Sequence, residues 1–390
     1  MKKGSSKLLR LAAGALAVLT CASMSGCGIT SITADRDKVL GAKIVVIGQA
    51  KDIQFWDYVE QGATDAGKEL GYTVEYYNAN NTSDVDGQRT LIQNAIDTNA
   101  KAIVLAPNSA TELNEVIRNA GDKGIPVLTI DADIDNANIR KAYIGTINAS
   151  AGSIAARQAV THLSENKVNG KFGKVGIITH SESSSAAGQR VGGFQGELTS
   201  RLRAMLGNKA SGASANAGAP ANTGAPGEDA GSGEGGAPQG GPPAGAGGDT
   251  DVIAGVMNCE GNADTAKDMA TSMINSNPDL RVLYATNERS TIGVCEAVKA
   301  AKAEGKAENL MVIGYNSNTA EIEYIRTDIL TGTMVQNPYN MGYLGVLYAG
   351  NVLTGDSVPA MIDTGVTYVH KTNLNNTEIQ LLLDPVNAVE

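Results

Sequence analysis

The stretch KIVVIGQAKDIQFWDYVEQGATDAGKELGYTVEYY (43–77) decides the fold. It opens with a β-branched run at 43–49 and closes with another at 72–77, and the segment 55–70 between them carries apolar residues at helical spacing. Gly71, directly after that segment, is typical of the end of a helix. This order predicts a strand, a helix and a second strand, which is the repeating unit of a parallel sheet.

The same alternation continues along the chain. It predicts further strands at 102–107, 125–130, 142–146, 173–179, 252–257, 280–285, 310–315, 332–336 and 364–370. It predicts helices between them at 84–99, 109–122, 150–165, 186–203, 262–277, 288–303, 319–327 and 339–353. Nearly continuous Val and Ile runs separated by helices indicate parallel strands covered on both faces. We therefore expect an α/β protein of two doubly wound lobes, with ligands beyond the carboxyl ends of the strands.

The composition excludes several classes of protein. The 390 residues contain 31 Lys and Arg against 41 Asp and Glu, and a net charge of −10 is unsuited to nucleic acid. The three His form no metal-ligand spacing, and neither a G-x-S-x-G motif nor a Walker A motif is present. We therefore expect no metal, no cofactor and no enzymatic activity.

The N-terminus resembles a bacterial lipoprotein signal. Four Lys and Arg within the first ten residues precede the apolar run LAAGALAVL (11–19), and MSGC (24–27) follows. The resemblance implies removal of residues 1–26, lipid attachment at Cys27 and a tether over 27–40. An uncleaved membrane anchor is the alternative, although the residues before Thr33 are too polar for a good spanning helix.

Residues 211–248 depart from the pattern. Of these 38 residues, 13 are Gly, 10 are Ala, 5 are Pro and 3 are Ser, so we expect a disordered surface insertion within the second lobe. Two cysteines, Cys259 and Cys295, remain in the body of the chain. Export would permit a disulfide between them, but we favour two unpaired structural thiols.

Phe55 and Trp56 follow the first predicted strand and include the only Trp of the chain. A flat apolar ring at this position suits the C–H face of a sugar or a heterocycle. The alternative is that one of the two rings covers the core.

Six motifs resemble the periplasmic sugar-binding proteins of ABC importers, ribose/galactose type. They are the FW pair followed by GA (62–63), IPVLTIDADIDNANIRKAYIGTINASAG (125–152), SSAAGQRVGGF (184–194), YATNE (284–288), VIGYN (312–316) and MVQNPYNMG (334–342). The resemblance implies the type I periplasmic binding protein fold, whose two lobes are joined by a three-crossing hinge. It places the first lobe at 41–147 with 337–362 and the second at 148–336 with 363–390.

The resemblance also assigns a set of ligand-binding residues. They are Phe55, Trp56, Asp131, Asp133, Arg190, Asn287, Asn316 and Gln336. Asn316 stands where the family has Asp, and Ala132 stands where ribose-type proteins have Arg, which leaves another pentose, a hexose or a polyol open. The structural alternatives are a turn or a cap for Asp131, helix N-caps or loop positions for Asn287 and Asn316, and an exposed or charge-paired helical position for Arg190. His180 is either structural or ligand-facing.

The implied function is that of a monomeric, lipid-anchored substrate-binding protein outside the cell membrane. It would carry a monosaccharide or polyol to ABC permease subunits. The main alternative is a sensor that presents its ligand to a chemoreceptor or histidine kinase. A sugar-responsive repressor would need a helix-turn-helix where the export signal stands. A sugar hydrolase would need Asp131 and Asp133 as a catalytic pair.

Overall fold

The computed structural model describes residues 39–182, 184–211 and 252–385. The predicted signal segment, Cys27 and residues 212–248 of the predicted insertion lie outside the described residues. Among the described residues, no helix combines the length and the apolar character needed to cross a bilayer.

The first sheet has six parallel strands in the order β11-β5-β4-β3-β1-β2. Their bounds are β1 Lys43–Gly48, β2 Thr73–Asn78, β3 Ala102–Leu105, β4 Val127–Ile130, β5 Tyr143–Gly145 and β11 Met361–Asp363. The helices that accompany it are α3 Gln54–Leu70, α4 Val85–Asp97, α5 Asn114–Asp122 and α11 Pro338–Leu353. This sheet and these helices are called the first lobe below.

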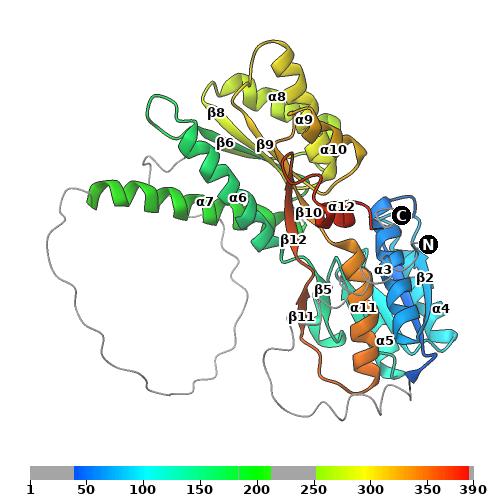
Figure 1. Ribbon diagram of the computed structural model, residues 1–390. Helices are drawn as coiled ribbons and strands as arrows, with labels where there is room; N and C mark the ends of the chain where they lie inside the picture. The colour runs from blue at the N-terminus through cyan, green and yellow to red at the C-terminus, as the bar shows by residue number, and fades with distance from the viewer. Residues whose placement is uncertain (1–38, 183, 212–251, 386–390) are drawn as a thin grey trace, which may run out of the picture. The chain divides into compact units, whose positions relative to one another are not determined.

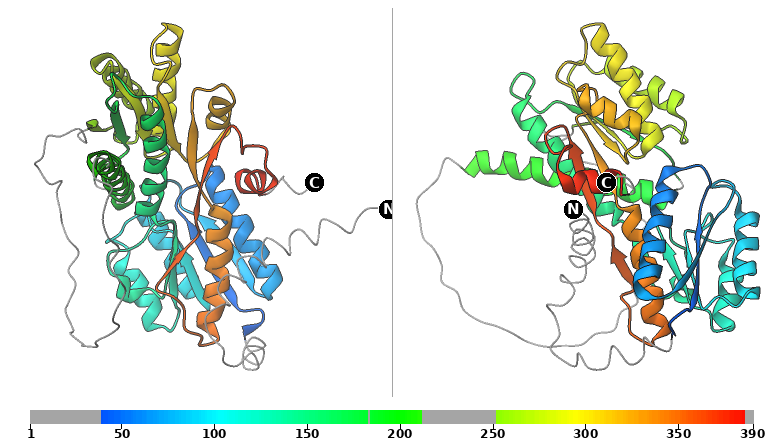
Figure 2. Two further views of the ribbon diagram at one scale, coloured as in Figure 1. Left: turned by 60° about the vertical axis from the view of Figure 1, so that its left-hand side comes forward. Right: turned by 45° about the vertical axis from the view of Figure 1, so that its right-hand side comes forward.

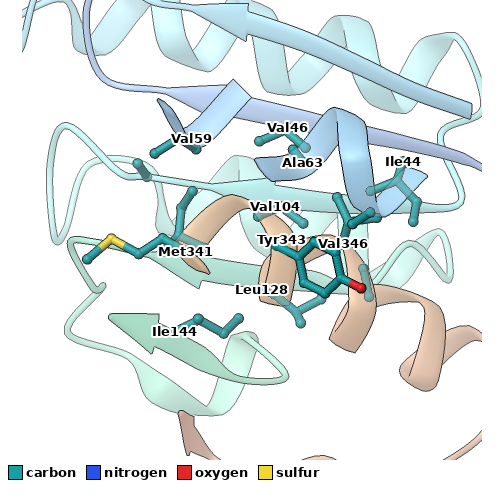
Figure 3. Packing of buried hydrophobic residues seen from close by; sticks show 14 of the residues in the cluster. Ile44, Val46, Val59, Ala63, Val104, Leu128, Ile144, Met341, Tyr343 and Val346 are labelled. Carbon is teal, nitrogen blue, oxygen red and sulfur yellow. The ribbon is translucent and has the colours of Figure 1, made fainter. Parts of the chain in front are cut away.

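Both faces of the first sheet are buried. Ile44 and Val46 of β1 pack under α3 and α11, which lie side by side in Figure 1, and the labelled side chains of Figure 3 belong to this cluster. Val45 and Ile47 point to the other face and pack with residues of α4 and α5. The near-continuous apolar character of the strand follows from this two-sided burial.

The second sheet also has six strands, in the order β12-β10-β9-β8-β6-β7. Their bounds are β6 Lys174–Thr179, β7 Ile253–Asn258, β8 Leu280–Ala285, β9 Met311–Tyr315, β10 Gly332–Gln336 and β12 Val366–His370. The accompanying helices are α6 Asn148–Glu165, α7 Ser185–Ser211, α8 Ala263–Ser276, α9 Glu288–Ala303 and α10 Thr319–Arg326. Helices α6 and α7, drawn in green, pack against each other (Figure 2), as do α8 and α9. These elements are called the second lobe.

The two sheets share one strand order, so β4 corresponds to β9 and β5 to β10. The chain passes from one sheet to the other after β5, after β10 and between β11 and β12, which confirms the predicted two-lobed α/β architecture. By the packing of its backbone, the chain divides into two compact units, one of which is Asn148–Gly314. This division separates β10 and β12 from the other strands of their sheet. Backbone hydrogen bonds nevertheless join β10 to β9, so β10 and β12 belong to the second sheet.

Several elements differ from the sequence-based expectation. The edge strand β12 is antiparallel to β10, whereas a wholly parallel sheet was predicted. The three-residue strand β11 and the seven-residue helix α12 (Thr377–Leu383) were not predicted, because both are too short to show a period. Helix α5 begins five residues later than predicted, because the Ser109 hydroxyl accepts from the backbone N–H of Glu112 at 3.1 Å and forms a turn.

Candidate functional site

The aromatic pair stands at the start of α3, after the carboxyl end of β1. The Trp56 side chain is only 3% exposed and belongs to the core cluster of the first lobe, while Phe55 is half-buried. Their ring centroids lie 4.9 Å apart in an edge-to-face arrangement. The alternative that one ring covers the core therefore applies to Trp56, and Phe55 is the ring with more surface for a ligand.

Asp131 is the first residue after β4, and its φ of 59° places it in the left-handed region. Its N–H donates to the Ile144 carbonyl at 3.1 Å, and its own carbonyl accepts from the Tyr143 hydroxyl at 2.8 Å. The residue is half-buried. Asp131 thus continues the ladder toward β5 while its backbone turns away from the strand.

Asp133 is engaged within its own loop. Its Oδ1 accepts from the Thr129 hydroxyl at 2.7 Å, the Ile134 N–H at 2.9 Å and the Arg140 Nε at 2.7 Å. Its Oδ2 accepts from Arg140 Nη2 at 2.6 Å, which completes a two-pronged ion pair. Because a carboxylate offers about four acceptor positions, little capacity remains on Asp133 for a ligand.

Arg190 of α7 is 7% exposed and makes two hydrogen bonds within the second lobe. Its Nε donates to Asn148 Oδ1 at 2.8 Å, and its Nη1 donates to the Thr286 carbonyl at 2.7 Å. Helices α6 and α7 approach each other closely at Gly193, where an added Cβ would lie only 2.1 Å from the Ala149 carbonyl oxygen. This close approach sets Asn148 within reach of the guanidinium.

His180 joins the Arg190 group from the end of β6. Its Nδ1 lies 2.8 Å from the Thr286 hydroxyl oxygen, which also accepts from the His180 backbone N–H at 3.1 Å. Burial, followed by repulsion from the Arg190 charge, lowers the pKa of His180 to about 4. The imidazole is therefore neutral at pH 7, and a neutral imidazole has one donor and one acceptor.

Asn287 is the N-cap of α9. Its Oδ1 accepts from the Ser290 N–H at 2.9 Å, and the Ser290 hydroxyl in turn accepts from the Asn287 N–H at 3.0 Å. The capping alternative that the sequence offered is what the structure contains. The cap occupies Oδ1, so the amide N–H₂ is the part of Asn287 suited to a ligand.

Asn316 and Gln336 contact each other. Gln336 is 6% exposed, and its Nε2 donates to Asn316 Oδ1 at 3.1 Å. Asn316 follows β9 directly and has a φ of 76°, so it too lies in the left-handed region. Its N–H donates to the Met334 carbonyl at 2.7 Å, and its carbonyl accepts from the Thr333 hydroxyl at 2.7 Å.

The predicted residues thus form local groups rather than isolated side chains. Four residues that the sequence analysis did not single out complete these groups: Asn148, Thr286, Tyr143 and Thr333. Three of them, Tyr143, Asn148 and Thr286, lie inside the motifs quoted above, so their polar side chains within those motifs were the signal that could have identified them. Among the described residues, no three His, Cys, Asp or Glu side chains are placed to hold a metal ion.

A separate hollow of about 650 Å³ lies in the second lobe, lined by Glu182, Met257, Asn258, Glu260, Thr265, Asp268, Met269 and Ser272. None of the predicted ligand-binding residues lines it. Cys259 and Cys295 are both buried, and no disulfide joins them, as expected.

A family model described as "Periplasmic binding protein domain" matches residues 44–224 and 237–357. The chain belongs to this family. Among its curated relatives in the family is the D-allose-binding periplasmic protein of Escherichia coli (strain K12), 24% identical over 82% of this chain and 88% of the relative. The ribose import binding protein RbsB of Haemophilus influenzae is 22% identical over 89% of this chain and 96% of the relative.

Solved structures of periplasmic binding proteins agree with this assignment. A solute-binding protein of Agrobacterium vitis with bound D-fucose is 26% identical, covers 88% of this chain and 100% of its own, and has a TM-score of 0.63. A carbohydrate-transporter solute-binding protein of Agrobacterium radiobacter, in complex with D-arabinose, is 25% identical over 88% of this chain and 98% of its own, with a TM-score of 0.65. These relatives are named as binding and transport proteins rather than as enzymes.

Proposed function

We propose that this chain is the substrate-binding lipoprotein of a sugar ABC transporter. It binds a monosaccharide or polyol with residues from both lobes and delivers it to a membrane permease. The names of the relatives support this function, since they are proteins that bind allose or ribose and proteins crystallised with arabinose or fucose.

One observation carries the proposal: the assigned residues follow the carboxyl ends of parallel strands in both sheets. Asp131 comes directly after β4 and Asn316 directly after β9. Asn287 follows β8 closely, and Phe55 lies at the start of α3, the helix that follows β1. In doubly wound sheets this is the edge where ligands bind.

The chemistry of the assigned groups suits an uncharged polyhydroxylated ligand. Each sugar hydroxyl both donates and accepts, so a site needs acceptors such as the Asp131 carboxylate and donors such as Arg190 and the Asn287 amide. The Phe55 ring offers an apolar surface to the C–H groups of a sugar ring. A ligand that lacks one hydroxyl would leave a buried protein group unpaired, and this requirement gives selectivity without a reaction.

In this proposal, residues 41–147 with 337–362 and 148–336 with 363–390 are the two bodies that move about the three crossings. A sugar that contacts both would favour the closed state by its difference in affinity for the two states. Lipid at Cys27 would hold the protein at the outer face of the membrane.

Isothermal titration calorimetry tests the binding step. The wild-type protein, without residues 1–26, is titrated with D-allose, D-ribose, D-arabinose, D-fucose and a panel of polyols. Saturable binding of at least one is expected, and Asp131→Ala should abolish it while the protein remains folded by circular dichroism. Failure of every sugar and polyol to bind contradicts the proposed function.

Two measurements in cells test the remaining steps. Deletion of the gene should abolish uptake of the radiolabelled sugar that binds, whereas a sensor would leave uptake intact and remove the response to that sugar. Cys27→Ser should move the protein from the membrane fraction to the soluble fraction, and retention in the membrane would contradict lipid attachment at this residue.

A further inference from the structure

Asp131 and Asn316 occupy the same place in the two lobes. Strands β4 and β9 are third in the two sheet orders, and each residue is the first one after its strand. Both residues have a positive φ, 59° for Asp131 and 76° for Asn316. Such values are uncommon outside glycine, although Asp and Asn tolerate them better than most residues.

The two backbones are held by the same pair of contacts. In each case the N–H donates to a carbonyl of the next strand, Ile144 at 3.1 Å for Asp131 and Met334 at 2.7 Å for Asn316. In each case a hydroxyl from the residue just before that acceptor donates to the carbonyl of the turned residue. Tyr143 supplies this hydroxyl to Asp131 at 2.8 Å, and Thr333 supplies it to Asn316 at 2.7 Å.

The two hydroxyls are inside the protein. Tyr143 is 8% exposed and Thr333 is fully buried. The Tyr143 side chain lies back over β5, since a Cβ on Gly145 would stand 2.3 Å from its hydroxyl oxygen. Tyrosine and threonine share little except a hydroxyl, so the hydroxyl is the common feature of the two lobes.

The physical consequence concerns the direction of the side chains. A left-handed residue at the end of a strand turns its carbonyl out of the ladder, and a buried carbonyl needs a donor. Loss of the donor leaves that carbonyl unpaired and removes a reason for the backbone to stay left-handed. A change of φ at this residue would redirect its Cβ, and with it the polar group that faces the ligand.

We propose that Tyr143 and Thr333 are positioning residues for sugar binding. Their hydroxyls fix the backbone of Asp131 and Asn316, so the carboxylate and the amide are set before the sugar arrives, and the cost of ordering them is not taken from the binding energy. This inference rests on the proposed function, because it assumes that these two side chains meet the sugar.

Thr333 permits a test that separates the hydroxyl from the shape. Thr333→Val keeps the shape and removes the hydroxyl, whereas Thr333→Ser keeps the hydroxyl and leaves a small cavity. The Val variant should raise the Kd about fivefold, the factor that about 1 kcal/mol represents, and the Ser variant should stay close to wild type. A role of Thr333 in packing alone predicts the reverse order, since Ser leaves a cavity whereas Val keeps the shape.

Tyr143→Phe should likewise raise the Kd about fivefold. Its matched control is Tyr343→Phe, since Tyr343 is also 8% exposed and its hydroxyl donates to Glu69 at 2.9 Å. Glu69 lies fourteen residues beyond Phe55 in α3, which is about 20 Å along the helix. The control should lose stability as Tyr143→Phe does, but keep the wild-type Kd.

The probe is whichever of D-allose, D-ribose, D-arabinose and D-fucose binds the wild type most tightly, measured by calorimetry. Amide hydrogen exchange without sugar gives a second readout: Tyr143→Phe should speed exchange in residues 131–134, and Tyr343→Phe should not. A wild type that binds no sugar contradicts the proposed function and this inference together. A wild type that binds, with unchanged affinity and exchange in Tyr143→Phe and Thr333→Val, overturns this inference alone.

Discussion

Replacement of His180 by glutamine should remove a defined part of the acid sensitivity of the second lobe. The imidazole is held by the Thr286 hydroxyl at 2.8 Å and lies near the Arg190 guanidinium. Burial and that positive charge lower the pKa of His180 from its ordinary value of 6.5 to about 4. The folded state therefore holds the neutral ring, while the unfolded chain binds a proton at a higher pH.

The sign and size of the effect follow from linkage. The stabilisation is fully present above the unfolded pKa of 6.5 and is lost as the pH falls toward the folded pKa of about 4, because the unfolded state gains its proton first. Integration of this difference down to about pH 4.5 gives a loss of about 2.5 kcal/mol for the wild type. Glutamine cannot titrate, so His180→Gln should lack this loss.

The assay is urea unfolding followed by circular dichroism at pH 7 and pH 4.5, with the free energies of unfolding compared between the two proteins. Carboxylates titrate in both proteins, so their contribution cancels in the comparison. His162→Gln makes the same chemical change outside the Thr286–Arg190 group and reports the general effect of losing an imidazole. A difference between wild type and His180→Gln that is equal at the two pH values would refute the reasoning.

Three further predictions concern the packing and the ion pair that the structure shows around single residues. Gly193→Ala should lower the free energy of unfolding by about 1–3 kcal/mol, because the new Cβ would collide with α6. Gly192→Ala has open space around its Cβ and should raise the free energy of unfolding slightly, and thermal unfolding compares the two variants. Asp133→Asn weakens the ion pair with Arg140 and should mainly lower the free energy of unfolding, by about 2 kcal/mol. Asp131→Asn should mainly weaken sugar binding, and an equal loss of sugar affinity in the two variants, measured by calorimetry, would contradict this. Trp56→Ala should destabilise the first lobe by about 3–5 kcal/mol in urea unfolding, and a smaller loss would show that its ring is not part of the core.

The sequence predicted the strands and helices that carry a long or strong pattern of apolar residues. Strand β1 and helix α3 were visible because buried Val and Ile residues and a seventeen-residue amphipathic segment leave a strong pattern. The direction of β12 could not be seen in the same way. A run of β-branched residues does not encode whether it meets its neighbour parallel or antiparallel, and this depends on the path of the chain after β11.

The residue types of the candidate site were predictable, but which of these residues make structural contacts and which are left for a ligand was not. Asn287, directly before a predicted helix, is a readable N-cap, so its dual character was visible. The ion pair of Asp133 with Arg140 joins residues seven apart across an irregular loop, a contact that no period encodes. Phe55 and Trp56 are adjacent on a helix and point about 100° apart, so they are buried to different depths. Trp56 lies inside the core cluster, whereas Phe55 packs against it and is only partly buried. Which of the two is the deeper one depends on the residue at which the helix starts.

Under the proposed function, the correspondence between the two lobes would present an asymmetric ligand with two different polar groups. Each lobe carries a left-handed residue after its third-listed strand and a hydroxyl that holds it, yet the side chain is a carboxylate in one lobe and an amide in the other. An ionised carboxylate only accepts hydrogen bonds, whereas a carboxamide both accepts and donates. The fold holds the backbone of both residues in the same way, and under the proposed function their side chains would offer the ligand a carboxylate from one lobe and an amide from the other.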